Sequence, residues 1–137
     1  MATACGNIFI IGGLTGIEDG NPAIGDVCIT KITSKGTVLW AKKIGYAGSF
    51  DQPHDAKGTT DGGVIIAGAT QSHNPHGDAW LIKLDANAAI EWSFGSGAPS
   101  GSLMNVIQLS DGGYAAVGDI SVGLDNLGAV TLPAAYT

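Results

Sequence analysis

The sequence has few charged residues and no long apolar run. Charged side chains make up 13% of its 137 residues, against roughly 25% in an ordinary globular protein. Six basic residues stand against twelve acidic ones, which gives a formal net charge of −6, whereas nucleic-acid binding normally needs a basic surface. The longest apolar runs, such as Ile8–Ile11 and Val64–Ala67, are as long as a strand, but a membrane-spanning helix needs about 20 residues. We therefore expect no nucleic-acid partner and no membrane insertion.

Signals for export and for disulfide bonding are also scarce. The first residues lack the basic segment and the long apolar segment of a signal peptide, so the sequence leaves the localisation open. It contains only two cysteines, Cys5 and Cys28. A hairpin in this region would set Cys28 opposite about Ile11 and leave Cys5 well away from it, whereas the Cα atoms of a disulfide lie within about 7 Å. Two small buried thiols are the favoured interpretation.

Glycine, by contrast, is abundant. It supplies 22 of the 137 residues, or about 16%, which is more than twice the usual share of about 7%. The apolar share of 45% is ordinary, which excludes a chain that is disordered through low hydrophobicity. The glycines do not recur at every third position, as they do in collagen. This composition predicts a turn-dense, all-β protein.

Two segments of the sequence recur at a spacing of about 50 residues. Residues 25–32, GDVCITKI, return at 77–84 as GDAWLIKL, an offset of 52. Residues 60–68, TDGGVIIAG, return at 110–118 as SDGGYAAVG, an offset of 50, and residues 6–13, GNIFIIGG, are an eroded copy of the same segment. A repeat of this length is typical of β-propeller blades.

Each repeat divides into four short strands separated by turn residues. Asp61-Gly62-Gly63 is a tight-turn signal, because glycine tolerates the positive φ that such turns need. Along Trp80–Leu84 apolar side chains point to both faces, which indicates a sheet covered on both sides. Together these features favour a β-propeller with blades of four antiparallel strands. The strands of the central repeat are expected at 53–59, 64–68, 80–84 and 89–94, and the repeats of this single domain at about 5–50, 51–100 and 101–137, the last one degenerate.

The central repeat also resembles a known family of propeller repeats. Residues 61–70, DGGVIIAGAT, then 77–85, GDAWLIKLD, and then Trp92 are similar to repeats that are abundant in secreted or surface proteins of bacteria and archaea and are kelch-like in layout. The resemblance covers nearly the whole chain and implies an extracellular or cell-surface setting.

Two positions depart from the pattern of this family. Ala88 stands where the family has glycine in the turn before the outer strand, a position that Gly36 occupies in the first repeat, and alanine is disfavoured at positive φ. At an offset of 50, residues 77–85 fall on residues 127–135, where Pro133 replaces the lysine. Proline belongs at the edge or the end of a sheet.

The number of strands leaves such a propeller incomplete. The first repeat lacks its innermost strand, the central repeat is complete, and the third has two good strands and a poor third one, or about two and a half blades. Propellers have at least four blades, and an open arc would expose apolar faces and strand edges. We expect either a homo-oligomer, with a dimer of five or six blades favoured, or a fragment of a longer gene product.

Loop residues that differ between repeats are the candidate ligand-binding residues, because propellers bind ligands through loops at strand ends and across the central channel. They are His54, His73, His76, Gln71, Asp51 and Tyr46. A metal site at His73, His76 and Asp78 is the alternative to a solvated loop, which is the favoured interpretation. Asp78 recurs as Asp26 and is better explained as a turn cap.

Repeated residues indicate scaffolding, because a catalytic site is needed only once. This applies to the turn residues Asp61 and Asp111, and also to the pairs Lys31 and Lys83, and Trp40 and Trp92. The sequence implies no catalytic residue and no cofactor. It predicts a noncatalytic binding or structural module that presents loops to a protein or glycan partner. The alternatives are a propeller enzyme acting on glycans, a hydrolase or a lyase, and a fragment of a larger surface protein with no function of its own.

Overall fold

The computed structural model describes residues 6–18, 21–45, 49–71, 77–97, 100–122 and 125–132. These residues form ten β-strands and no helix, which confirms the predicted all-β class. The strands are β1 (Ile8–Glu18), β2 (Asn21–Ile32), β3 (Val38–Ile44), β4 (Asp51–Gly58), β5 (Val64–Thr70), β6 (Asp78–Leu84), β7 (Ile90–Gly95), β8 (Ser100–Gln108), β9 (Tyr114–Val122) and β10 (Asp125–Leu132). In this part of the chain no helix is long and apolar enough to cross a membrane.

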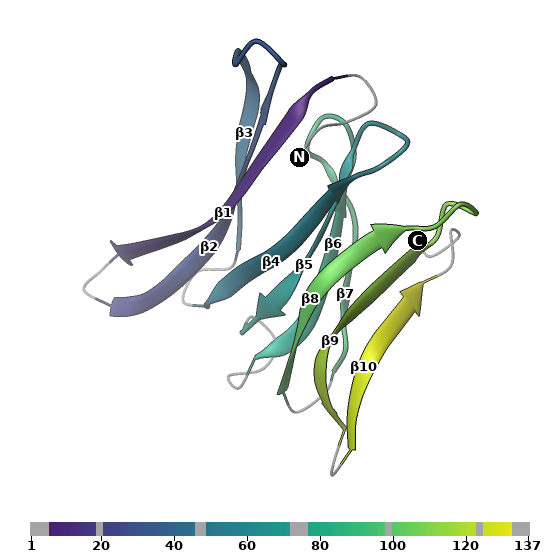
Figure 1. Cartoon of the computed structure of the whole chain (residues 1–137). Coiled ribbons are helices and arrows are strands. Elements are labelled where there is room, and N and C mark those ends of the chain that lie inside the picture. Colours follow the sequence, from purple (N-terminus) through teal and green to yellow (C-terminus); the bar gives the residue numbers. More distant parts are fainter. Residues whose placement is uncertain are drawn as a thin grey trace.

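The strands form three antiparallel sheets, in each of which neighbouring strands follow one another along the chain (Figure 1). Sheet A consists of β1, β2 and β3, sheet B of β4, β5, β6 and β7, and sheet C of β8, β9 and β10. Sheet B therefore contains the four strands predicted for the central repeat. Sheet A has no counterpart of β4 among the described residues, and sheet C has three strands.

Tight turns make this pairing of consecutive strands possible. Between β4 and β5, the Thr59 amide donates to the Gly63 carbonyl (3.0 Å) and the Gly62 amide to the Thr59 carbonyl (3.0 Å). The Asp61 carboxylate accepts a bond from the Gly63 amide (2.9 Å), and Gly62 has φ +81°. The turn between β8 and β9 repeats this arrangement around Asp111, which accepts from the Gly113 amide (2.9 Å). Asp61 and Asp111 are thus turn residues, as predicted.

The first strands of sheets B and C each contain a bulge at the same place. The register between β4 and β5 shifts between Pro53 and Asp55, so that His54 is the extra residue. The shift between β8 and β9 falls fifty residues later, at Met104. Opposite each bulge the backbones come so close that only glycine fits, because a Cβ on Gly68 or Gly118 would lie 2.0 Å from a backbone oxygen of the bulged strand.

Sheet B lies between the other two sheets and is covered on both faces (Figure 1). One face of β6, with Trp80, Ile82 and Leu84, packs against sheet A, and Leu81 on the other face packs against sheet C. All seven residues of β6 are buried. Trp40 packs into the core between sheets A and B, and Trp92 into the core between sheets B and C. The two-sided burial and the core role of these two tryptophans are confirmed.

Three details of register differ from the sequence-based expectations. The β1–β2 hairpin extends beyond the eroded repeat segment to the pair Glu18 and Asn21, and it sets Cys28 opposite Gly12, one residue from the expected position. Cys5 lies outside the described residues. In sheet C, Leu132 pairs with Tyr114, whereas an offset of 50 predicts residue 134 there. The third repeat is two residues shorter at this point, and an irregularity between Leu127 and Ala129 accompanies the difference.

Candidate functional site

Three of the six predicted ligand-binding residues, Tyr46, His73 and His76, lie outside the described residues. The other three, Asp51, His54 and Gln71, occupy two different parts of the molecule. Asp51 and Gln71 lie together at one end of sheet B, whereas the ring of His54 contacts sheet C.

Asp51 begins β4 and is buried. Its carboxylate accepts hydrogen bonds from the Ser49 hydroxyl (3.2 Å) and from the hydroxyl of Thr70 at the end of β5. The backbone amide of Gln71 donates to the Phe50 carbonyl (2.9 Å). These contacts fasten β5 to the start of β4, so that the buried carboxylate has a structural role.

His54 connects the first strands of sheets B and C. Its Nδ1 lies 2.9 Å from the Leu103 carbonyl oxygen. Because a carbonyl only accepts hydrogen bonds, Nδ1 carries the proton. The neighbouring Asp55 accepts a bond from the Val106 amide (3.0 Å) and pairs with Lys57 (2.6 Å). The bulge at His54 therefore aims two consecutive side chains at β8.

The carboxylate of Asp78 forms hydrogen bonds within the chain. Its carboxylate accepts hydrogen bonds from the Ser96 hydroxyl and from the Gly97 amide (3.1 Å) and so holds the segment that follows β7. Its counterpart Asp26 pairs with Lys43 (2.5 Å) at the end of β3. No group of three or more histidine, cysteine, aspartate or glutamate residues within the described ranges could hold a metal ion.

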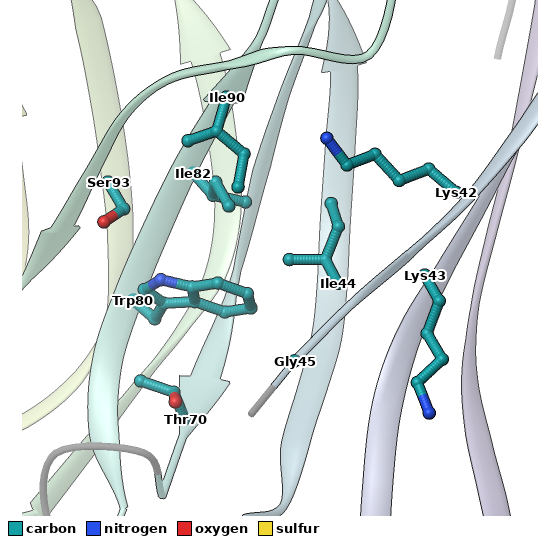
Figure 2. A pocket seen from close by; sticks show the side chains of 9 residues that line it. All are labelled: Lys42, Lys43, Ile44, Gly45, Thr70, Trp80, Ile82, Ile90 and Ser93. Atoms are coloured by element: carbon teal, nitrogen blue, oxygen red, sulfur yellow. The ribbon is translucent and has the colours of Figure 1, made fainter. Parts of the chain in front are cut away.

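A cavity of about 320 Å³ opens between sheets A and B, near the ends of β3 and β5 (Figure 2). Apolar side chains form much of its wall, and two lysines, two hydroxyls and one indole add polar groups. The lining residues are Lys42, Lys43, Ile44, Gly45, Thr70, Trp80, Ile82, Ile90 and Ser93. The cavity adjoins Asp51 and Gln71, since Thr70 bonds to the first and precedes the second.

The polar groups of this cavity differ in how far the protein already uses them. Lys43 is paired with Asp26, and the Thr70 hydroxyl donates to Asp51. Lys42 donates to the Ala88 carbonyl and extends along the cavity in Figure 2. Ser93 lies on the exposed strand β7. Lys42 keeps donors beyond the one given to Ala88, and no described residue accepts a hydrogen bond from the indole N–H of Trp80.

Comparison of the repeats explains why the cavity forms between sheets A and B. Lys42 stands fifty-two residues before Phe94, and Phe94 packs against the core between sheets B and C. The long, charged Lys42 leaves open the space that the aromatic ring takes in the next repeat. Sequence reasoning missed this site because Lys42 and Trp80 lie in strands, whereas the search was confined to loops. A charged residue at the repeat position of an aromatic one was the available signal.

A cluster of charged side chains lies at the other interface, around Lys83. Its side chain is buried, and Nζ donates to Asp61 (2.7 Å), to Glu91 (2.7 Å) and to the Leu84 carbonyl (2.8 Å). Burial lowers the pKa of Lys83, but the hydrogen bonds to Asp61 and Glu91 and the charge of Asp61 outweigh it, and the pKa lies above its ordinary 10.5. Burial also raises the pKa of the Tyr114 hydroxyl.

For Asp61, burial raises the pKa, but the bonds from Lys83, Thr59 and the Gly63 amide together lower it below its ordinary 3.8. Asp61 and Lys83 thus hold each other in their ionised forms, and Glu91 completes the cluster. They fix the β4–β5 turn to the outer strand β7, which is a structural role.

No protein-family model and no curated protein matches this sequence. Inferences about function therefore rest on the geometry of the sheets and of the cavity.

Proposed function

We propose that this chain is a noncatalytic, blade-forming module of a β-propeller, which assembles with a second copy of itself and presents its loops to a protein or glycan partner. The observation that carries the proposal is the unequal burial of equivalent positions in the three sheets. Sheet B has a sheet packed on each face, whereas sheets A and C each have one.

The outer face of sheet A carries apolar residues at positions that sheet B buries. Ile66 of β5 has an exposed fraction of 0%, whereas its counterpart Ile10 in β1 is 55% exposed. Leu14 and Leu39 are also large exposed apolar residues of sheet A. In sheet B the corresponding face packs on sheet A, so this face is suited to receive another sheet.

The outer face of sheet C also carries exposed apolar residues. Ala67 of β5 has an exposed fraction of 0%, whereas Val117, its counterpart in β9, is 49% exposed. Ile107 of β8, which pairs with Ala115, is exposed as well. In sheet B the corresponding face packs on the next sheet along the chain, so this face is suited to cover a following sheet.

The outer face of sheet C is therefore suited to pack on the outer face of sheet A of another copy, whereas two copies of the same face are not expected to pack together. If sheet C of one copy covers sheet A of another, the packing already present between sheets A and B is repeated between copies. Closure of two copies in this way gives six sheets, which is within the four to eight blades known for propellers. It also removes both exposed apolar faces, whose burial stabilises by roughly 25 cal/mol per Å².

The partner-binding part of the proposal concerns the loops after β3 and β5, where Tyr46, Gln71, His73 and His76 stand in the sequence. Screening of the intact chain on a glycan array tests whether these loops bind a glycan. Binding that falls when His73 and His76 are both changed to alanine supports a binding module. Turnover of any bound glycan contradicts the noncatalytic assignment.

Cross-linking tests the head-to-tail contact. Ile11 and Ile66 share the core between sheets A and B, and Val117 of one copy and Ile10 of the next take the equivalent places. In a background with Cys5→Ser and Cys28→Ser, the Ile10→Cys and Val117→Cys variants are mixed and treated with a short bis-maleimide. The mixture is expected to give a covalent dimer, and either variant alone is expected to give little.

Ile90→Cys is the matched control, because Ile90 is equally exposed but lies on β7 of sheet B, away from the outer face of sheet C. Its mixture with Ile10→Cys should remain uncoupled. Equal coupling in all samples, or none in any, contradicts the proposed contact.

A further inference from the structure

We propose that the cavity between sheets A and B binds a small carboxylate that has an apolar body. The cavity is formed within one copy of the chain, so this inference does not depend on the assembly proposed above. Three properties of the wall carry it, namely a positive charge that no described carboxylate pairs with, an indole N–H that no described residue accepts a bond from, and an apolar surface.

The positive charge is that of Lys42. Lys43, the other cation of the wall, is neutralised by Asp26 at 2.5 Å. Among the described residues no carboxylate pairs with Lys42, whose Nζ donates to the Ala88 carbonyl. An ammonium has three donors, so Lys42 can hold that carbonyl and still bind an anion. A cationic ligand would meet an unneutralised like charge here.

The second property is the indole N–H of Trp80. The Trp80 side chain is only 6% exposed, and no described residue accepts a hydrogen bond from its Nε1. All fully buried side-chain nitrogen and oxygen atoms in the described part of the chain do have partners, so this N–H is not fully buried, and the Trp80 side chain lines the cavity. Figure 2 shows the indole at the cavity wall, between Thr70 and Ile82. A nearly buried donor favours a ligand that supplies an acceptor oxygen.

The third property is the apolar remainder of the wall. Ile44, Ile82 and Ile90 line the cavity, and Ile90 is 50% exposed, so that a ligand would remove apolar surface from water. The volume of about 320 Å³ is at the lower end of the range of roughly 300 to 1,000 Å³ for small-molecule sites. The site is therefore suited to a compact ring or branched chain that carries one carboxylate.

The experiment follows the Trp80 indole resonance in the ¹⁵N–¹H spectrum of the intact protein. The Trp80 resonance is assigned as the indole signal that disappears in the Trp80→Phe variant. The indole signals of Trp40 and Trp92 serve as internal controls, because these residues do not line the cavity. Benzoate, cyclohexanecarboxylate and glucuronate are titrated to millimolar concentrations, and benzamide serves as the neutral match of benzoate. We expect a saturable shift of the Trp80 signal with benzoate or cyclohexanecarboxylate, weaker binding of the polar acid glucuronate, and binding at least tenfold weaker for benzamide.

Lys42→Met tests the charge, and Lys35→Met is its matched control, because Lys35 lies in the turn after β2 and does not line the cavity. The first change should weaken carboxylate binding at least tenfold, and the second should leave it unchanged. If Lys42→Met does not fold, added salt on the unmodified protein provides the same test, because it screens the ammonium and should weaken binding.

Three results would overturn the inference. One is the absence of a saturable shift with both benzoate and cyclohexanecarboxylate. The second is a shift that benzamide reproduces with equal affinity, and the third is a shift that neither Lys42→Met nor salt weakens. A response to benzoate or cyclohexanecarboxylate with a weaker response to glucuronate supports the apolar body of the ligand, and a response to glucuronate alone would contradict it.

Discussion

At the scale of single residues, equivalent lysines of two repeats make different contacts. Lys31 donates to the carbonyls of Gly62 and Ala86 in the neighbouring sheet, at 3.1 Å each. Lys83 instead binds the carboxylates of Asp61 and Glu91. Glu91 accounts for part of the difference, because its counterpart in the first repeat is Leu39. A repeated residue can thus keep a structural role while its partners change.

The lowered pKa of Asp61 makes stability depend on pH in acid. Because its folded-state pKa lies below 3.8, the ionised carboxylate stabilises the fold above its unfolded-state pKa, and this contribution is lost as the pH falls through the folded-state value. We expect Asp61→Asn to be less stable than the unmodified protein at neutral pH and the difference to shrink between about pH 5 and pH 2. Urea unfolding across this range measures it, and a constant difference would contradict the account.

Ala88 provides a second test at the residue scale. It has φ +70°, whereas Gly36, at the same place in the first repeat, has φ +86°. The two turns have the same hydrogen bonds, because the Ala88 amide donates to Asp85 (3.2 Å) and the Gly36 amide to Thr33 (2.9 Å). The sequence left open whether the alanine alters the turn. It keeps the turn and adopts the left-handed conformation.

We therefore expect Ala88→Gly to stabilise the protein by about 1 kcal/mol and Gly36→Ala to destabilise it by a similar amount, because the left-handed conformation costs about 1–2 kcal/mol with a Cβ. Thermal or urea unfolding of the two variants checks this. Equal and unchanged stabilities would show that neither turn is strained.

The candidate site was less predictable than the turns. Repetition identified the scaffold residues correctly at Asp61, Asp111, Trp40 and Trp92, since a residue needed in every sheet recurs with the sheet. Differences between the repeats were a poorer guide to the candidate site. His54 is absent from the other repeats, but its ring contacts Leu103 and so has a structural role. The cavity follows instead from Lys42, which stands where the next repeat has Phe94, and a comparison restricted to loops does not detect a difference within strands.

At the scale of strands, two-sided burial makes β6 the centre of the structure. Leu81 is completely buried in the core between sheets B and C. Leu81→Ala should destabilise the protein by about 2–5 kcal/mol, as is usual for a buried leucine. Ile90→Ala in the adjacent strand β7 is the control, because Ile90 is exposed, and it should cost less than about 1 kcal/mol. Similar losses for the two variants in urea unfolding would contradict the two-sided packing.

The strands themselves followed from the sequence, because apolar runs bounded by glycine-rich turns mark them clearly. Their ends and register did not. The bulges at His54 and Met104 depend on backbone contacts with Gly68 and Gly118 across the sheet. The displacement of β10 likewise depends on a local irregularity near Leu127. Such features arise from pairing with a neighbouring strand and leave little trace in one segment alone.

At the scale of the whole molecule, the three sheets form a stack. Sheet B in the middle has both faces covered, whereas sheets A and C at the ends each have one face covered. The outer faces of sheets A and C keep the apolar character of the covered faces, as Ile10 and Val117 show. A stack of this kind buries its remaining apolar surface only if further sheets are added at both ends. The proposed pairing of sheet C with sheet A of a second copy supplies them.

Light scattering of the unmodified 137-residue chain at micromolar concentration, after size-exclusion chromatography, tests this claim most directly. The account predicts a particle of two copies, with twice the 13.7 kDa mass of one chain. A well-folded particle with the mass of one chain would contradict it.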